Sequence, residues 1–370
     1  MSALDELYLQ RACELAARGI GNTAPNPPVG AVLVRDGRIV GEGYHHRTGD
    51  AHAEGIALAA AGGAARGATA YVSLEPCNHV GRTPACTRAL ADAGIARVVA
   101  GTIDPNPKTQ GRGVAFLRAR GIDVEVANDS RAGKLVELFA GSLRTDRPYV
   151  ALKMAMSLDG AVASRPGIAQ WLTSEATRSY VRDLRIAHDA VMVGAGTVRV
   201  DDPALTVRPP HHRLRPFVRI VACETDSVPD SSRIFAPAED YARTIVLAPA
   251  GARTRFEALA AAGDVTFVGD ERSERLDLGL ALHALRERAI YSVLCEGGPT
   301  LAARLIAGGH ADRFYWAIAP VLLQRDGAVP VLAGIDLAER QPSLEFDGVE
   351  RIGSDIVVTG RFGRHSTGSG

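Results

Sequence analysis

The chain has 370 residues, which predicts two domains at ~100–200 residues per domain. Hydrophobic residues make up 46% of it and charged residues 23%, a balance typical of folded globular proteins and not of disordered ones. The 42 Lys and Arg are matched by 42 Asp and Glu, so the formal net charge is zero. This balance disfavours a general electrostatic attraction to nucleic acid or to anionic membranes.

Features of the chain ends and of the cysteines indicate a cytoplasmic protein. The N-terminus is acidic and amphipathic and lacks the basic and apolar regions of a signal peptide. No apolar run reaches the ~18–20 residues that span a membrane. Five Cys is an odd and low count, which argues against a disulfide scaffold and leaves metal binding or catalysis as possible roles.

Helices and strands are expected to alternate along the first part of the chain, as in a layered α/β domain. Ser2 and Asp5 have the spacing of a capping box, and Asp36-Gly37 is a typical hairpin turn. The predicted helices are 4–18, 53–61, 86–93, 114–120 and 134–143, and the predicted strands are 29–34, 39–41, 70–74, 97–101 and 122–126.

A charged stretch with a proline, residues 144–148, predicts the boundary between two domains. We expect a first domain at 1–146, a second at 147–364, and a small polar tail at 365–370 that frays. A second α/β pattern follows the boundary. Its predicted strands are 149–154, 190–193, 217–222, 244–247, 291–294 and 313–318, and its predicted helices are 174–188, 256–262, 280–288 and 300–307.

One His and two Cys have the pattern of a catalytic zinc site. His52, Cys77 and Cys86 form a suitable ligand set for Zn²⁺ and leave the fourth tetrahedral position to water. Glu54 follows the His by two residues, as in the zinc deaminases, where such a Glu moves the protons of the reaction. Two thiolates cancel the charge of zinc, so a nearby base is useful for taking the proton of the water.

Two other interpretations of these residues remain open. The zinc site is structural if a fourth protein ligand closes it, and His79 is the candidate for that ligand. Alternatively, no metal is bound and the two thiols are simply buried. The other cysteines, Cys13, Cys223 and Cys295, have no partner at a metal-binding spacing and are expected to be plain buried residues.

Two glycine-rich turns of the second domain are candidates for binding a dinucleotide. Residues 193–198 follow a predicted strand but lack the third glycine and the acidic residue of the Rossmann fingerprint. Residues 296–300 lie between a strand and a helix, where backbone N–H groups can bind a pyrophosphate. An ordinary strand-to-helix connection would carry the same residues, so neither turn decides the function alone.

The longer motifs resemble the bifunctional riboflavin-biosynthesis deaminase–reductase family. The resemblance implies a cytidine-deaminase-like three-layer α/β domain followed by a dihydrofolate-reductase-like α/β domain. It also implies deamination of 2,5-diamino-6-ribosylamino-4(3H)-pyrimidinone 5′-phosphate at zinc, then reduction of the ribosyl group to ribityl by NADPH. The segments that carry the resemblance are 25–32, 41–45, 52–54, 74–77, 81–86, 104–107, 152–160, 171–173, 189–194, 201–203 and 295–300.

The family resemblance implies site residues in both domains. Lys153 would supply a cation to the group that accepts the hydride, alongside Glu54 as the other catalytic residue. The substrate contacts expected in the deaminase are Asn26, His45, His79, Arg82, Asp104 and Asn106. The NADPH contacts expected in the reductase are Met156, Trp171, Thr197, Asp201, Gly298, Pro299, Thr300, Leu301 and Arg304. The substrate contacts expected in the reductase are Ala169, Arg185, Leu205, Arg208 and Glu296.

Two departures from the family pattern have consequences for the reductase. Ala169 stands where the family usually has a Ser that contacts the substrate, and one hydroxyl hydrogen bond is worth ~0.5–1.5 kcal/mol. We therefore expect weaker binding, or a water in place of the hydroxyl, and not loss of activity. Residues 223–227 also depart from the Asp-Ser pattern that the family has after this strand, which puts a cofactor contact there in doubt.

Two other function classes were weighed against the bifunctional enzyme. One is a nucleoside or nucleic-acid-base deaminase with a non-catalytic second domain, but aromatic residues are only 5% of the chain and a base-acting enzyme needs stacking aromatics. In the other, the second domain only binds a ligand or drives oligomerisation. The expected partner is a small phosphoribosylamino-pyrimidine, with no nucleic acid and no membrane. A homo-oligomer, dimer or tetramer, is expected because the apolar stretch 313–318 suits a core or an interface.

Overall fold

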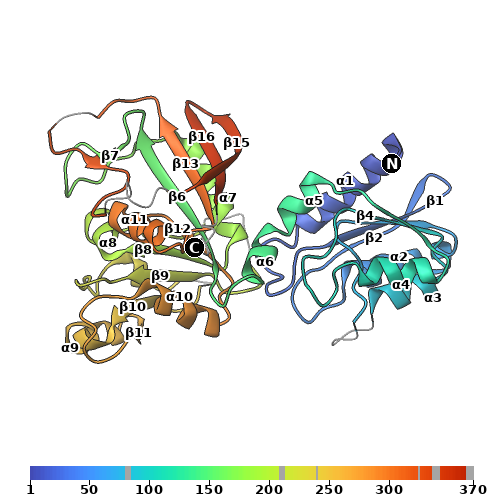
Figure 1. Cartoon of the computed structure of the whole chain (residues 1–370), viewed down its shortest axis with the longest axis horizontal. Helices are drawn as coiled ribbons and strands as arrows, with labels where there is room; N and C mark the ends of the chain where they lie inside the picture. Colours follow the sequence, from blue (N-terminus) through green and yellow to red (C-terminus); the bar gives the residue numbers. More distant parts are fainter. Residues whose placement is uncertain (80–84, 208–212, 239–240, 324–325, 336–341, 364–370) are drawn as a thin grey trace, which may run out of the picture. The chain divides into compact units, whose positions relative to one another are not determined.

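The computed structural model describes residues 1–79, 85–207, 213–238, 241–323, 326–335 and 342–363. The chain divides into two compact units, Met1–Arg144 (unit 1) and Thr145–Gly370 (unit 2). The division lies within the charged stretch 144–148. The tail 365–370 lies outside the described residues. Each unit has its own sheet and its own hydrophobic core (Figure 1).

Unit 1 is built on a five-stranded sheet in the order β2-β1-β3-β4-β5. The hairpin β1–β2 turns at Asp36 and Gly37, both with positive φ, and β1 runs antiparallel to β3. The strands β3, β4 and β5 are parallel, as expected where helices connect them. The strands are β1 (Gly30–Arg35), β2 (Arg38–Tyr44), β3 (Thr69–Val72), β4 (Arg97–Ala100) and β5 (Asp123–Val126).

Helices cover both faces of this sheet and give three layers. Leu9 and Leu15 of α1 pack on one face, and Ala57 of α2, Leu90 of α3 and Leu117 of α4 pack on the other. The expected capping box of α1 is present. The helices are α1 (Ala3–Ala17), α2 (Ala53–Ala61), α3 (Cys86–Asp92), α4 (Arg112–Ala119), α5 (Ser130–Leu135) and α6 (Glu137–Ser142).

Two glycines of β2 let α2 lie directly against the sheet. A Cβ on Gly41 would stand 2.2 Å from the carbonyl oxygen of Ala57, and one on Gly43 would stand 2.5 Å from that of Ala53. Real Cβ atoms do not approach backbone this closely, so only glycine permits the contact. This close packing fixes the first turn of α2, where Glu54 lies.

Unit 2 is built on a nine-stranded sheet in the order β11-β10-β9-β8-β12-β6-β13-β16-β15. The strands from β11 to β13 are parallel to their neighbours, and β16 and β15 add an antiparallel hairpin. The strands of this sheet are β6 (Tyr149–Ser157), β8 (Ala190–Gly194), β9 (Val218–Ala222), β10 (Ile245–Pro249), β11 (Asp264–Val268), β12 (Ser292–Cys295), β13 (Arg313–Ala319), β15 (Leu344–Ile352) and β16 (Asp355–Phe362). A separate two-stranded antiparallel sheet is formed by β7 (Ala161–Ala163) and β14 (Val329–Pro330).

Two apolar clusters fill the faces of the parallel part of this sheet. Leu285 of α10 and Leu305 of α11 belong to one cluster, and Val198 of α8 and Phe256 of α9 belong to the other. Such a sheet, with helices on both faces, buries its central strands completely. The helices are α7 (Glu175–Ala187), α8 (Ala195–Asp201), α9 (Arg253–Phe256), α10 (Leu278–Glu287) and α11 (Pro299–Ala307).

The structure corrects several expected elements. The helix expected at 134–143 is two helices, because the chain leaves helical geometry at Val136 (φ −97°, ψ 3°), and the first of them begins at Ser130 under an Asp129 cap. The helix expected at 256–262 is wrong, since α9 ends at Phe256 and a 3₁₀ turn follows at Glu257–Ala260. The elements that the sequence pattern missed are α8, β7, β11, β14, β15 and β16.

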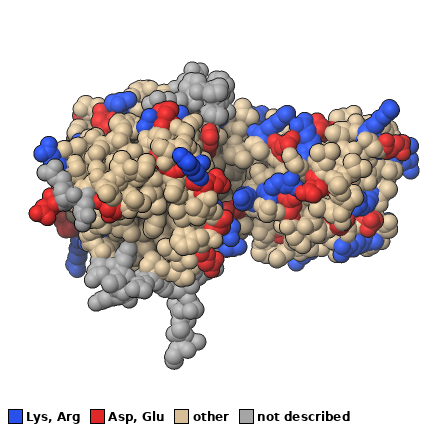
Figure 2. All heavy atoms as spheres, turned by 90° about the horizontal axis from the view of Figure 1, so that it is seen from above, with Lys and Arg blue, Asp and Glu red and all other residues tan. Residues whose placement is uncertain are grey.

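Charges of both signs are interspersed over each unit on the face drawn in Figure 2, and neither sign gathers into one patch there. Among the residues that the structure describes, no helix is both long enough and apolar enough to cross a membrane.

Candidate functional site

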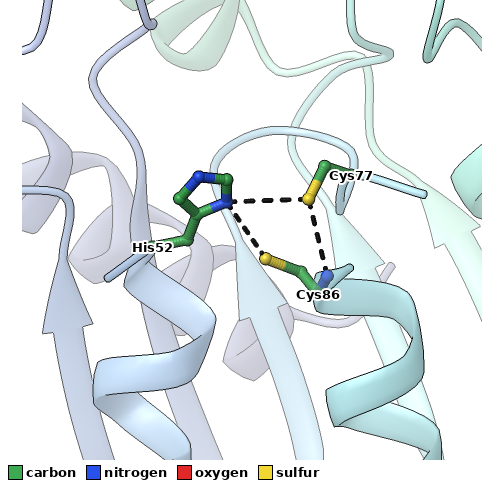
Figure 3. Close-up of side chains that lie close together, drawn as sticks. All are labelled: His52, Cys77 and Cys86. Carbon is green, nitrogen blue, oxygen red and sulfur yellow. Dashed lines mark hydrogen bonds between the residues drawn. The ribbon is translucent and has the colours of Figure 1, made fainter. Parts of the chain in front are cut away.

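Three segments of unit 1 bring the expected metal ligands together. His52 immediately precedes α2 in an extended conformation (φ −73°, ψ 162°), and Cys86 is the first residue of α3. Cys77 lies in the loop that follows β3. All three side chains point toward a common centre (Figure 3).

The geometry of these side chains fits a zinc ion. His52 Nδ1 is 3.2 Å from the Sγ atom of Cys86 and 3.6 Å from that of Cys77, and all three donor atoms lie within 4.8 Å of one another. A tetrahedral zinc with ordinary Zn–N and Zn–S bonds separates its ligands by about 3.5 Å. Within the described residues the group holds three ligands, and His79, which is exposed, is not one of them. The described residues thus supply three protein ligands, the number that a catalytic zinc centre has.

The surroundings of the two thiols favour a thiolate already in the protein alone. The Cys86 side chain, followed by the His52 ring and the Cys86 backbone N–H, lowers the pKa of Cys77 to about 4. The same contact, together with burial, raises the pKa of Cys86. Cys77 in turn raises the pKa of His52. Zinc needs both sulfurs deprotonated and the imidazole neutral, so binding it releases protons.

Glu54 is the buried carboxyl beside this centre. Its side chain is only 3% exposed, in the first turn of α2. Burial, with the negative charge of Cys77 as the second cause, raises the pKa of Glu54 to about 7. A group with a pKa near neutrality can both accept and return a proton, which is the role expected for this residue.

Asn26 and His45 form a polar pair next to the zinc ligands. His45 Nδ1 is 3.1 Å from the carbonyl oxygen of Ala51, so this nitrogen carries the proton. His45 Nε2 then accepts from Asn26 Nδ2 at 3.2 Å, which leaves the Asn26 carbonyl oxygen for a ligand N–H. Burial lowers the pKa of His45 and keeps its ring neutral. The His45 ring centre is 5.3 Å from that of His52.

The other expected substrate contacts of the deaminase lie in two segments. Asp104 is buried, and its Oδ1 accepts from the backbone N–H of Asn106 at 2.8 Å. The Asn106 side chain in turn accepts from Lys108 N at 3.0 Å, so the loop is held by its own side chains. His79 is exposed, and Arg82 lies outside the described residues.

Unit 2 holds a cavity of about 850 Å³ where its parallel strands end. Gly194 at the end of β8 and Ala222 at the end of β9 line it, together with Glu296 directly after β12. Ligands of parallel α/β sheets bind at this edge, outside the carboxyl ends of the strands. The first turn of α11 opens into the same cavity through Pro299 and Thr300.

Three charged side chains form the polar floor of the cavity. Glu296 accepts two hydrogen bonds from Arg185, from Nη2 at 2.8 Å and from Nε, and Arg185 Nη1 also donates to the carbonyl oxygen of Thr206 at 3.0 Å. Lys153 of β6 lies half-buried beside them, and desolvation of its ammonium group lowers its pKa. The ammonium group of Lys153, partly shielded from water beside the Arg185–Glu296 pair, is suited to stabilise negative charge on a bound ligand.

The cavity collects most of the residues expected at the reductase site. Its size, its two glycine-rich walls and the helix N-terminus fit an extended dinucleotide such as NADPH. A Cβ on Gly298 would meet Thr197 Oγ1 at 3.0 Å, so the two walls approach closely there. The expected residues that line the cavity are Lys153, Ala169, Trp171, Arg185, Thr197, Asp201, Leu205, Glu296, Gly298, Pro299, Thr300 and Leu301.

Two of the described residues expected to contact NADPH do not line the cavity. Met156 lies near the end of β6, opposite Ile318 of β13. Arg304 is turned toward Glu224, with Nη1 2.8 Å from the carboxylate, and also donates to the carbonyl oxygen of Leu276 at 2.7 Å. Arg208 lies outside the described residues.

Comparison with known proteins covers nearly the whole chain. A family model described as the RibD C-terminal domain matches residues 148–358, and one described as the cytidine and deoxycytidylate deaminase zinc-binding region matches residues 2–102. The riboflavin biosynthesis protein RibD of Escherichia coli (strain K12) is 41% identical over 369 residues, which cover 96% of this chain and 98% of that protein. The chain belongs to the RibD family.

Solved RibD structures are similar over the same extent. RibD of Acinetobacter baumannii (form 1) has a TM-score of 0.81 at 34% identity and covers 98% of this chain and 99% of its own. The Thermotoga maritima diaminohydroxyphosphoribosylaminopyrimidine deaminase/5-amino-6-(5-phosphoribosylamino)uracil reductase has a TM-score of 0.81 at 34% identity, with coverages of 97% and 99%.

Membership of the RibD family confirms the family, the order of the two α/β domains and the bifunctional class expected from the motifs. The enzyme is a zinc-dependent deaminase and an NADPH-dependent reductase of riboflavin biosynthesis. A nucleoside or nucleic-acid-base deaminase with a non-catalytic second domain is not favoured, because the relatives share both halves of the chain.

The structure of this chain also contains polar residues whose positions the sequence did not indicate. Glu75 is buried behind Cys77 and accepts hydrogen bonds from backbone N–H groups of a distant loop, a contact that no local pattern indicates. Glu224, Thr225 and Asp226 line the reductase cavity, in the segment 223–227 where the departure from the family pattern had put a cofactor contact in doubt. These residues directly follow β9 and lie at the same sheet edge as Gly194. Because ligands bind at this edge of a parallel sheet, their position in the sequence could have indicated a place in the site.

Proposed function

We propose that this chain deaminates 2,5-diamino-6-ribosylamino-4(3H)-pyrimidinone 5′-phosphate in unit 1 and then reduces its ribosyl group to ribityl in unit 2. The observation that carries the first step is the buried Glu54 beside three zinc ligands. The reaction named for the Thermotoga maritima enzyme supports both steps.

In the deaminase, each protein group has a separate task. His52, Cys77 and Cys86 hold the zinc ion, which when bound acidifies a water molecule and so supplies the nucleophile. Glu54 accepts the proton of that water and returns it to the departing ammonia. The Asn26 carbonyl oxygen, oriented by His45, accepts a hydrogen bond from the polar edge of the pyrimidine ring.

The loop residues of the deaminase select the rest of the substrate. Asp104 and Asn106 are proposed to contact the ribose and the phosphate, together with His79 and Arg82. Asp104 is buried next to the centre and carries a carboxyl whose pKa is raised by burial, which suits a group that meets ribose hydroxyls.

In the reductase, the charged floor of the cavity activates the hydride acceptor. NADPH supplies the hydride when bound between the two glycine-rich walls. Lys153 places its ammonium group against the sugar oxygen or imine that gains negative charge as the hydride arrives. Glu296 holds Arg185 in place through two hydrogen bonds, so that the guanidinium faces the sugar phosphate.

The proposed sequence of reactions is tested by following both products. The enzyme is given the diaminopyrimidinone substrate first without NADPH and then with it. Ammonia should be released in both cases, and the ribityl product should form only with NADPH. Formation of a reduced product that still carries the amino group would overturn the proposed order.

We further propose that this enzyme works in a reducing compartment such as the cytoplasm, because its zinc site needs two reduced cysteines. All five cysteines are free thiols, and the donor atoms of Cys77 and Cys86 lie within 4.8 Å of each other. Oxidising conditions would join two sulfurs this close and destroy the metal site.

A homo-oligomer is proposed to form through the β15–β16 hairpin of unit 2. The strand register places Phe346, Val349 and Ile356 on one face of the hairpin, where they are 67%, 67% and 45% exposed. An apolar sheet face of this kind suits a second copy of the same face across a two-fold axis. Val349→Glu should lower the mass measured by sedimentation equilibrium, and an unchanged mass would contradict the proposed interface.

A further inference from the structure

Glu75 is a buried carboxylate with an unusual set of partners. It is 3% exposed and lies between β3 and the zinc ligand Cys77. Within the described residues no Lys or Arg forms an ion pair with it, and it accepts four backbone N–H hydrogen bonds instead. The donors are Asp104 N (3.1 Å) and Gly111 N (2.9 Å) to Oε2, and Gly113 N (2.9 Å) and Val114 N (3.0 Å) to Oε1.

These donors match a carboxylate and no other side chain of this size. An ionised carboxylate accepts about four hydrogen bonds and donates none. The amide of a glutamine would turn two N–H bonds toward backbone N–H groups that also donate. The four contacts of Glu75 therefore depend on its chemistry and not on its volume.

The position of the donors makes Glu75 a clamp on one loop. Asp104 is at the start of the loop and Gly111 at its end, so Oε2 of one carboxylate joins both ends. The remaining two donors are in the first turn of α4, which the carboxylate caps. The loop carries Asp104 and Asn106, the proposed contacts for the ribose and phosphate.

The other side of the clamp is the zinc ligand segment itself. A Cβ on Gly113 would stand 2.1 Å from the carbonyl oxygen of Pro76, so the start of α4 lies directly on the residue before Cys77. The backbone N–H of Glu75 also donates to the carbonyl oxygen of Thr102 at 2.9 Å. The substrate loop and the metal ligand are thus tied to each other through one residue.

We propose that Glu75 is a positioning residue of the deaminase, which sets the distance between the zinc centre and the loop from Asp104 to Gly111. This inference rests on the proposed function of Asp104 and Asn106 in holding the substrate. Glu75 touches neither substrate nor metal in this role. Its loss should weaken substrate binding more than the chemical step, because Glu54 and the three ligands keep their own contacts.

The test compares Glu75→Gln with the wild-type full-length enzyme. The KM of deamination should rise about 10- to 100-fold with a smaller change in kcat, since a displacement of about 1 Å has effects of this order. Zinc content and the reduction of a substrate that is already deaminated should stay at wild-type levels. Glu75→Asp keeps the charge and should raise KM less than Glu75→Gln does. If the Gln variant does not fold, a raised KM in Glu75→Asp supports the proposal and an unchanged KM contradicts it.

A matched control removes a different carboxylate cap from the same unit. Asp129 Oδ1 accepts from the backbone N–H groups of Arg131 and Ala132 at the start of α5. Asp129→Ala removes this acceptor and should leave the KM of deamination unchanged. If KM rises as much in this variant as in Glu75→Gln, the proposal is overturned, because the loss of any helix cap in unit 1 would then raise KM.

A double-mutant cycle tests whether Glu75 acts through the loop. Asp104→Ala with Asn106→Ala should raise KM by itself, and adding Glu75→Gln to that pair should then raise it little further. Additive effects would overturn the positioning role. If the loop pair leaves KM unchanged while the wild type deaminates the substrate, the loop contacts and the role of Glu75 both fall, but the proposed reaction stands.

Discussion

The sites of the two units are built in different ways. Unit 1 brings three metal ligands and Glu54 together from separate segments, and the three donor atoms lie within 4.8 Å of each other. Unit 2 instead spreads its residues around a cavity of about 850 Å³, where Arg185 pairs with Glu296 and Lys153 lies beside them. A metal centre is built at fixed bond lengths, whereas a cofactor cavity needs shape and a few placed charges.

The largest effect is expected from Glu54→Gln, which separates the two units most sharply. The amide cannot accept the proton of the water, so deamination should fall by about 10²- to 10⁴-fold. Zinc content, measured by atomic absorption, should not change, since Glu54 is not a ligand. Glu14→Gln, at an exposed carboxylate of the same unit, is the control and should keep full activity. A Glu54→Gln enzyme that deaminates at the wild-type rate would break the assignment.

Lys153→Ala should produce the opposite pattern. Removal of the half-buried ammonium group leaves the charge on the hydride acceptor unbalanced, so NADPH oxidation should fall by about 10²- to 10³-fold. Ammonia release in unit 1 should be unchanged. Lys134→Ala, in α5 of unit 1, is the control. Equal loss of both activities in a folded Lys153→Ala enzyme would contradict the division of labour between the units.

The pH dependence of reduction should sharpen the role of Lys153. Burial lowers the pKa of this group from the ordinary 10.5. Lys153 is a cation below that lowered pKa and neutral above it, so the reductase rate should fall as the pH rises through it. Lys153→Arg keeps its charge at high pH and should lose this alkaline decline. A decline that persists unchanged in Lys153→Arg belongs to some other group.

The smallest expected effect concerns the wall of the reductase cavity at Ala169. Ala169→Ser restores the hydroxyl that the family usually has, and one such hydrogen bond is worth ~0.5–1.5 kcal/mol. The KM of the reductase substrate should fall about two- to tenfold, while deamination kinetics stay the same. An unchanged KM would mean that a water already makes this hydrogen bond.

The zinc centre was predictable from sequence because few residue types bind zinc and because local spacing decides where they lie. Ala53–Ala61 was expected as a helix and is one, so His52 and Glu54 fell at its start. The contacts of Glu75 and Arg304 were not predictable in this way. Each joins residues far apart in the chain, Glu75 to Gly111 and Arg304 to Glu224, and hydrophobic periodicity carries no information about such pairs.

The strand β15 was missed for a different physical reason. Strand prediction relies on one buried and one exposed face, but most of β15 is exposed, including Phe346 and Val349. Without a buried stripe the pattern resembles a loop. The parallel strands of unit 2, such as β8 and β12, are buried on both faces and were visible as short apolar runs.

The central claim is that two independent sites act in sequence, and mixing two inactive variants tests it most directly. Glu54→Gln and Lys153→Ala enzymes, each alone, should not convert the diaminopyrimidinone substrate to the ribityl product. Mixed in one tube with zinc and NADPH, they should oxidise NADPH after a lag, because the deaminated intermediate passes from one enzyme to the other. If each variant keeps its remaining activity but the mixture oxidises no NADPH, the account of two separable sites is wrong.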